Sequence, residues 1–342
     1  MNKLIGNYAE IYDENLYFTV FGLNVLGRID LNKNNTKYIM GPQEEKFVHF
    51  MPWGGIAKWN NKIIIVPYNT KSVWAYDNFV WEKLTEIIMP SGYMDYRFMG
   101  LEICGDNLFL IGHNYSNLLC INLNDKTCKN VFDANVKETP NWIRFFAQSK
   151  ARVDNTLYLA NHLTNHIVIF DMDTLQYEWK RVGDDNRKNV GIIHYKEDFW
   201  IIPTSSNHSL IRWNEEKGIV DEYEISVGMK NIWGAAEHND MVYFYGPKEK
   251  TIVFDIRNHC FRNTNLDIRY VKETDGCLLW WNDDSVLQIR NDKETKRILT
   301  FIDTDEMNSY IKSKSEIINK NLAGDIISES TAFSLKNYIA LM

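Results

Sequence analysis

The sequence predicts an all-β fold, a β-propeller of seven four-stranded antiparallel blades. Three observations lead to it: short strand-forming segments recur about every 45 residues, each repeat keeps an Asp or Asn at one position, and aromatic residues make up 13% of the chain. β-Branched and aromatic side chains suit a pleated sheet. A period near 45 residues is the size of one propeller blade. Helical repeats of that length would show a 3.6-residue periodicity, which this chain lacks.

The first segment of each repeat is short and apolar, as in Ile63–Val66 and Val242–Tyr245. Segments of this length and composition are typical of strands and too short for helices. Successive segments are separated by 42 to 49 residues. They begin near Leu16, Lys62, Leu108, Leu157, Phe199, Val242 and Val286.

The second segment ends in a large apolar residue followed by Asp or Asn, 13 to 17 residues after the first segment begins. The side chain of Asp or Asn can bond its own downstream backbone and open a tight turn, so we expect a hairpin in all seven repeats. The pairs are Ile29-Asp30, Tyr76-Asp77, Ile121-Asn122, Phe170-Asp171, Trp213-Asn214, Phe254-Asp255 and Ile302-Asp303.

Two further segments complete each repeat. One lies upstream of the first segment and often starts with a small residue, and a weaker one lies downstream, as in Trp81–Leu84. Each repeat then holds about four strands, a blade too thin to bury its faces alone. The small residues are Gly54, Gly100, Ala147, Gly191, Gly234 and Gly276.

The repeat predicts one propeller domain over residues 1–311. Residues 312–342 fall outside the period. Ser328-Glu329-Ser330 before an apolar stretch fits either a short capped helix or a strand that pairs into a blade. We expect this tail to pack on the propeller as a clasp.

Charge and composition exclude several classes of function. The chain has 38 Lys and Arg against 45 Asp and Glu, a net charge of −7, so we expect no nucleic-acid or membrane partner. No apolar stretch approaches the length of a membrane helix and no signal peptide is visible, which predicts a cytoplasmic protein.

The cysteines and histidines predict no metal site. The chain has five cysteines and no Cys-x-x-Cys, which argues against a disulfide framework and a structural zinc site. His162 and His166 flank a predicted hairpin turn, so they need not converge. The chain also lacks phosphate-binding and dinucleotide-binding glycine motifs, and we expect no cofactor.

The blade pattern resembles the kelch type of propeller. Val73–Asp77 with Trp81 is similar to the kelch tyrosine and tryptophan signature, and Phe170-Asp171 with Trp179 is a looser copy. The double glycine of kelch repeats at the end of the second strand is missing, since Val66–Asn69 stands at that position in repeat two. The resemblance implies an architecture over residues 8–311 and no particular activity.

A ligand site is expected where the connections entering each blade and the loops between strands two and three open on one face. A basic residue precedes the small residue by three or four positions in repeats three to seven, ending with Lys272 before Gly276. Arg binds carboxylate and phosphate through paired hydrogen bonds, and Trp stacks on a sugar or base face. The candidate ligand-binding residues are Trp53, Asn69, Arg97, Asn114, Trp142, Arg144, Asn161, Lys188, Asn231 and Trp233.

These residues predict binding of a small anionic or sugar-like molecule or a peptide. One alternative is a cofactor-free lyase, epimerase or hydrolase, with His113, His162 or Tyr68 as base and a nearby arginine neutralising developing charge. A second alternative is a protein-interaction scaffold that uses exposed loop aromatics.

Overall fold

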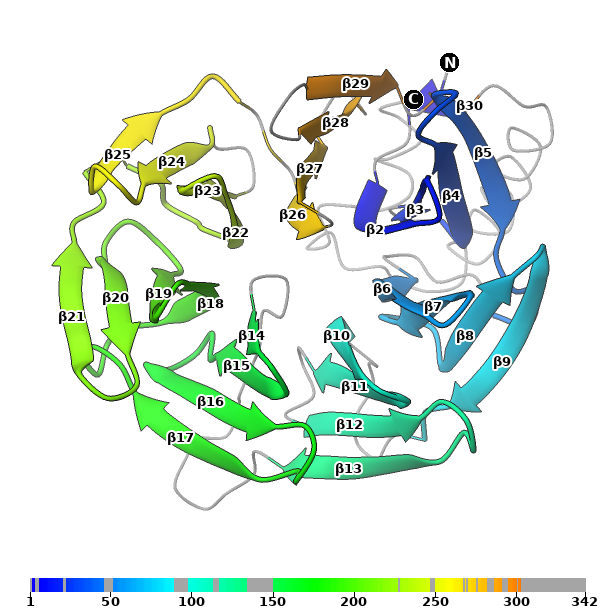
Figure 1. Ribbon diagram of the computed structural model, residues 1–342, viewed down its shortest axis with the longest axis horizontal. Helices are drawn as coiled ribbons and strands as arrows, with labels where there is room; N and C mark the ends of the chain where they lie inside the picture. Colours follow the sequence, from blue (N-terminus) through cyan, green and yellow to red (C-terminus); the bar gives the residue numbers. More distant parts are fainter. Residues whose placement is uncertain are drawn as a thin grey trace, which may run out of the picture.

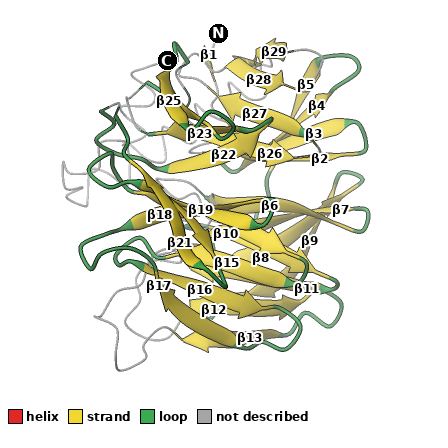
Figure 2. Cartoon of the chain, turned by 60° about the vertical axis from the view of Figure 1, so that its left-hand side comes forward, coloured by secondary structure: helices red, strands yellow, loops and turns green. Residues whose placement is uncertain are grey.

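The computed structural model describes residues 2–3, 6–20, 23–45, 52–88, 98–112, 117–133, 150–226, 228–246, 250–266, 268, 270–274, 276–281, 286–290, 295–299 and 301–302. Within these ranges every regular element is a β-strand (Figure 2). Strands β2 to β29 form seven antiparallel sheets of four strands, paired in chain order. The sheets surround a central axis as blades, so the predicted seven-bladed β-propeller is confirmed (Figure 1).

The blades follow the chain, and the first strand of each lies nearest the axis (Figure 1). Blade 1 contains β2 (Gly6–Tyr12), β3 (Asn15–Val20), β4 (Val25–Asp30) and β5 (Asn35–Met40). Blade 2 contains β6 (Trp53–Trp59), β7 (Lys62–Pro67), β8 (Ser72–Asp77) and β9 (Val80–Glu86). Blade 3 contains β10 (Phe98–Cys104), β11 (Asn107–Gly112), β12 (Asn117–Asn122) and β13 (Cys128–Asp133). Blade 4 contains β14 (Ala151–Val153), β15 (Thr156–Ala160), β16 (His166–Asp171) and β17 (Tyr177–Arg181).

The remaining blades have the same order. Blade 5 contains β18 (Asn189–Tyr195), β19 (Asp198–Pro203), β20 (Leu210–Asn214) and β21 (Gly218–Tyr223). Blade 6 contains β22 (Gly234–His238), β23 (Met241–Tyr245), β24 (Ile252–Asp255) and β25 (Cys260–Asn263). Blade 7 contains β26 (Tyr270–Thr274), β27 (Cys277–Trp281), β28 (Val286–Arg290) and β29 (Thr295–Leu299). A separate two-stranded sheet pairs β1 (Asn2–Lys3) with β30 (Phe301–Ile302).

The Asp or Asn that recurs at the end of the third strand caps the following turn, as the repeat predicts. Asp171 illustrates it: its Oδ1 accepts the backbone N–H groups of Asp173 and Thr174, at 2.9 and 2.8 Å. These bonds satisfy backbone donors that the turn withdraws from the sheet. The same paired capping occurs at Asp30, Asn122, Asn214 and Asp255.

The core lies between the faces of adjacent blades, and its large aromatic side chains account for the aromatic content of the chain. Phe18 of blade 1 lies against Trp281 of blade 7, with ring centroids 5.5 Å apart. Trp200 of blade 5 lies against Phe254 of blade 6 at 5.2 Å. All four side chains are almost fully buried. Each blade is therefore held by its neighbours, as expected for sheets that cannot cover themselves.

The inner strands of blades 2 and 3 approach so closely that one position requires glycine. A Cβ atom on Gly54 would lie 1.8 Å from the backbone oxygen of Phe98. No side chain fits that space, because the obstructing atom belongs to the backbone of β10. The small residue that begins the predicted upstream strand of repeat two is thus a consequence of blade packing.

The prediction for repeat seven is wrong by one strand. The segment that begins at Val286 is the third strand of blade 7, and the second strand is β27. Ile302 ends β30, which pairs with β1 outside the blade, so it is not the end of a third strand. Gly276 lies in the β26–β27 turn with φ of +70° and does not begin the inner strand. Fewer residues separate the second strands of blades 6 and 7 than separate those of the other neighbouring blades. A constant repeat length therefore points to the third strand of blade 7 instead of the second. The predicted C-terminal clasp, 312–342, lies outside the described residues.

Candidate functional site

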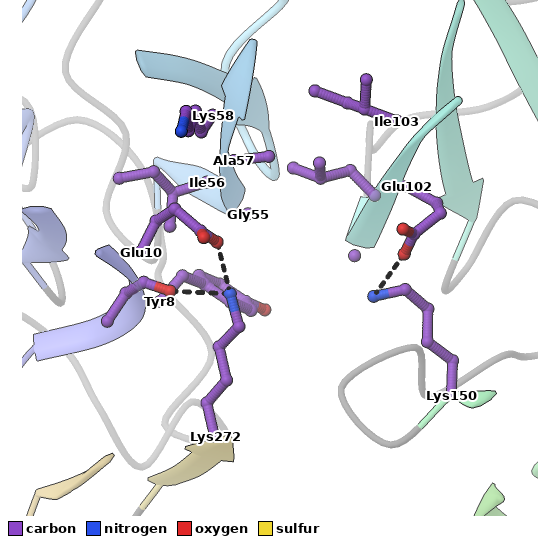
Figure 3. Close-up of a pocket in the computed structure, with 13 residues that line it drawn as sticks. Tyr8, Glu10, Gly55, Ile56, Ala57, Lys58, Glu102, Ile103, Lys150 and Lys272 are labelled. Carbon is purple, nitrogen blue, oxygen red and sulfur yellow. Dashed lines mark hydrogen bonds and ion pairs between the residues drawn. The ribbon is translucent and has the colours of Figure 1, made fainter. Parts of the chain in front are cut away.

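A cavity of about 350 Å³ lies on the axis of the propeller, among the inner strands. β2, β6 and β10 supply most of its wall, and Lys150 and Lys272 reach it from blades 4 and 7 (Figure 3). The volume is at the lower end of the range for small-molecule sites, about 300 to 1,000 Å³. The lining residues are Tyr8, Ala9, Glu10, Gly55, Ile56, Ala57, Lys58, Gly100, Leu101, Glu102, Ile103, Lys150 and Lys272.

On one side of the cavity a carboxylate of blade 1 meets a lysine of blade 7 (Figure 3). Lys272 Nζ lies 2.6 Å from Glu10 Oε2 and donates to the backbone oxygen of Ala9 at 2.8 Å. Both charged side chains are largely shielded from solvent, at 30% and 18% exposure. This ion pair joins blade 7 to blade 1 and so helps to close the ring of blades.

On the other side Glu102 of β10 is held by two cations of blade 4. Its Oε1 accepts from Arg152 Nη1 at 2.9 Å, and its Oε2 lies 3.4 Å from Lys150 Nζ. Burial acts to raise the pKa of Glu102, but the charges of Lys150 and Arg152 outweigh it and hold that pKa below its usual value. Glu102 is therefore an anion at neutral pH, and Lys150 shares it with Arg152.

The balance of charge in the lining is positive. Three lysines and two glutamates line the cavity. Lys58, the penultimate residue of β6, lies next to the β6–β7 turn, and its ammonium is 4.8 Å from the centre of the Tyr12 ring, a cation–π contact. The chain as a whole has a net charge of −7, so the positive charge of the cavity lining is opposite in sign to that of the whole chain.

The cavity occupies the half of the channel toward which the inner strands run. Its lining uses Gly55–Lys58 of β6 and Gly100–Ile103 of β10, in the middle and second half of each strand. The connections entering the blades lie at the opposite end of these strands. Among the described residues, the predicted ligand residues Lys188, Asn231 and Trp233 of those connections therefore lie at the other mouth of the channel.

At that other mouth three predicted residues lie in segments that are linked by backbone hydrogen bonds. Backbone hydrogen bonds join Lys188 O to Thr204 N and Thr204 O to Ile232 N, at 3.1 and 2.8 Å. The entering connections of blades 5 and 6 and the β19–β20 loop therefore share one face, as predicted. Lys188 and Asn231 are exposed there, and Trp233 is 47% exposed.

Three predicted residues of blade 2 lie around one backbone oxygen, that of Pro52. Tyr68 N and Asn69 N donate to Pro52 O at 2.8 and 3.3 Å. Tyr68 is 5% exposed and Trp53, the next residue after Pro52, is 2% exposed. The β7–β8 loop is thereby fastened to the connection that enters the same blade, and Asn69 is the half-buried member of the group.

Asn161 and His162 follow β15 at the junction of blades 4 and 5. Asn161 is fully buried, its Oδ1 accepts from Leu163 N at 3.0 Å, and its Nδ2 donates to Thr164 Oγ1 at 2.8 Å. Its backbone oxygen accepts from Asn189 N at 3.2 Å. His162 is half-buried. The amide of Asn161 thus shapes the β15–β16 loop.

The other predicted site residues lie outside the described residues. They are Arg97, His113, Asn114, Trp142 and Arg144.

Sequence reasoning missed most of the cavity. Glu10, Glu102 and Lys150 are absent from the predicted ligand residues, and Lys272, predicted in an entering connection, lies within β26. A signal was present: Glu10, Glu102 and Lys272 each stand two residues before the end of an inner strand. Three charged residues at one repeat position of a mostly apolar strand indicate a shared polar environment. This signal is visible only when the inner strands are aligned correctly from the sequence, and the predicted alignment is wrong for blade 7.

Among the described residues no group of His, Cys, Asp and Glu could hold a metal ion. The described part of the chain also contains no helix that could span a membrane.

Comparison with known proteins shows the fold. No family model and no curated protein matches the sequence. Virginiamycin B lyase from Staphylococcus aureus is similar in structure, with a TM-score of 0.61 and 12% identity over 87% of this chain and 95% of that one. BamB from Moraxella catarrhalis has a TM-score of 0.56 and 13% identity, over 85% and 87%. The computationally designed Ika8 protein has a TM-score of 0.55 and 9% identity, over 85% and 97%. At such low identity these likenesses concern architecture, and fold alone does not determine activity.

Proposed function

We propose that this protein binds a small, hydroxylated carboxylate, such as a sugar acid, in its central channel. The observation that carries the proposal is the cavity in which Lys58, Lys150 and Lys272 outnumber Glu10 and Glu102. The lysines supply donors for a carboxylate, and the glutamates accept from hydroxyl groups. Lys188, Asn231 and Trp233 at the opposite mouth are proposed to contact the same ligand or a longer one, such as a peptide.

Lys150 is a cation that a ligand can recruit without leaving the carboxylate of Glu102 unpaired. It lies 3.4 Å from Glu102, whereas Arg152 holds the same carboxylate at 2.9 Å, so Glu102 keeps a partner when Lys150 turns to a ligand. Lys272, by contrast, holds both Glu10 and a backbone oxygen. We therefore expect Lys150 to contact the carboxylate of the ligand while Lys272 maintains the wall.

The test is calorimetric titration with galacturonate and with galactose, which lacks the carboxylate. We expect binding of galacturonate in preference to galactose, and about tenfold weaker binding in Lys150→Ala, the loss of roughly one charge-assisted hydrogen bond. Lys180→Ala is the matched control, since Lys180 pairs with Glu178 on the outer strand of blade 4. Equal affinity for the two sugars, or unchanged affinity in Lys150→Ala, would contradict the proposal.

The catalytic alternative and the kelch resemblance stay predictions. The described residues that line the cavity include no histidine, so the cavity itself does not favour a His-based lyase, epimerase or hydrolase. Proton NMR of galacturonate kept with the protein separates binding from turnover. Of the residues that resemble the kelch signature, Trp81 contacts Tyr76, with ring centroids 4.9 Å apart. This contact stabilises the blade and implies no ligand.

A further inference from the structure

A second cavity, of about 180 Å³, lies on the outer two strands of blade 1, away from the channel. Every residue in its lining is polar or charged. These residues are Arg28, Asp30, Lys33, Asn35 and Lys37.

The pairing of β4 with β5 places two cations directly opposite each other. Arg28 pairs with Lys37, and Asp30 pairs with Asn35 two residues further along. Residues at this spacing share a face of the sheet, so all four side chains lie on one side. Like charges directly opposite on neighbouring strands repel each other. An anion bound between them would remove the repulsion.

The Arg28 side chain is held in position by β3. Its Nε donates to Asn15 Oδ1 at 2.9 Å, and its guanidinium carbon lies 5.9 Å from the centre of the Tyr17 ring. These contacts use one of the five donors of the guanidinium group, so both Nη groups are left for a ligand. Within the described chain no carboxylate forms an ion pair with Arg28 or Lys37.

The one acidic residue of the lining is already engaged. Asp30 Oδ1 accepts the backbone N–H groups of Asn32 and Lys33, each at 3.0 Å, and Oδ2 lies 3.6 Å from Lys33 Nζ. Asp30 therefore shapes the turn and balances part of the positive charge of Lys33. Three cations against one carboxylate give the lining a net charge of +2, which matches a doubly charged anion.

We propose that Arg28, Lys33 and Lys37 form a binding site for a phosphoryl group. The guanidinium fork suits the oxygen spacing of a phosphate, and the two lysines supply mobile point charges around it. The shared chemistry is a phosphate monoester, carried either by a small molecule or by a phosphorylated protein segment. This site is independent of the channel.

The test follows the Nε–H resonance of Arg28 by ¹H–¹⁵N NMR during titration with inorganic phosphate, at constant ionic strength held with sodium chloride. The signal is assigned by its disappearance in Arg28→Gln. We expect a saturable shift in the wild type and about tenfold weaker binding in Lys37→Thr. Without phosphate, Lys37→Thr should unfold no more easily than the wild type, because the substitution removes a like-charge contact and places a strand former.

Lys129→Thr is the matched control, since Lys129 is an exposed lysine on the outer strand of blade 3. It should leave phosphate binding at Arg28 unchanged. Glycerol 3-phosphate and a phosphoserine hexapeptide then distinguish the source: tighter binding of the peptide indicates a protein partner, and equal binding indicates a free metabolite. A shift that does not saturate, or one that is the same in the wild type and Lys37→Thr, would overturn the proposal.

Discussion

Arg187 allows a quantitative test of how the connection that enters blade 5 is fastened to that blade. Its side chain is 3% exposed, and three hydrogen bonds hold it: Nε to Asn189 Oδ1 at 2.7 Å, Nη1 to Ser209 O at 2.7 Å and Nη2 to Ile201 O at 3.0 Å. No ion pair is formed by Arg187 in the described part of the chain. This residue therefore acts as a fork that joins an entering connection to β19 and the end of the β19–β20 loop.

Arg187→Lys keeps a positive charge but loses the fork. One ammonium group cannot reach three separated acceptors, so about two charge-assisted bonds are lost, each contributing roughly 1.5 to 3 kcal/mol. We expect the free energy of unfolding to fall by about 3 to 6 kcal/mol at pH 7, a large share of the roughly 5 to 15 kcal/mol typical of a domain.

The pH dependence provides a second measurement on the same variant. Burial lowers the pKa of Arg187 to about 10, and burial should likewise lower the pKa of a lysine placed there. The unfolded chain then binds more protons than the folded one, so the stability of Arg187→Lys should rise with pH above neutrality. Between pH 7 and about 9 wild-type stability should not show this rise, because that range lies below the lowered pKa of Arg187.

The assay is equilibrium urea unfolding at several pH values, followed by tryptophan fluorescence. Lys188→Ala is the matched control, because Lys188 is the exposed neighbour in the same connection, and its loss should change stability by less than about 0.5 kcal/mol. A loss below about 1 kcal/mol in Arg187→Lys, with no dependence on pH, would refute the fork.

Two further predictions concern the inner strands. Gly54→Ala should lower the free energy of unfolding by about 1 to 3 kcal/mol, because its Cβ would meet Phe98 O, while Gly228→Ala, which meets nothing within 4 Å, should be tolerated in the same urea assay. Glu102→Gln should lower the free energy of unfolding by about 1 to 2 kcal/mol at pH 7. The pKa of Glu102 is lower in the folded protein than its ordinary value of 4.5, so ionised Glu102 stabilises the fold above pH 4.5. This stabilisation is lost as the pH falls through the lowered pKa. The difference between wild type and Glu102→Gln should therefore shrink in acid unfolding, and a difference that is constant from pH 7 to pH 3 would contradict this assignment.

The sequence alone determined the class of fold and most of its repeat. Strand formation and turn capping depend on neighbouring residues, so segments such as Ile63–Val66 and caps such as Asp171 can be recognised locally. The same local information was insufficient at blade 7. There fewer residues separate successive blades, and the segment that begins at Val286 forms a strand just as the true second strand at Cys277 does.

Only the tertiary structure decided which charged residues meet. Glu10 and Lys272 are far apart in the chain, yet lie 2.6 Å apart because blade 7 closes against blade 1. Arg187, a basic residue of the connection that enters blade 5, is buried because blade 5 offers it three acceptors. These contacts depend on how the chain packs in three dimensions: Glu10 and Lys272 meet only when the ring closes, and Arg187 reaches Ile201 and Ser209 only when blade 5 has formed.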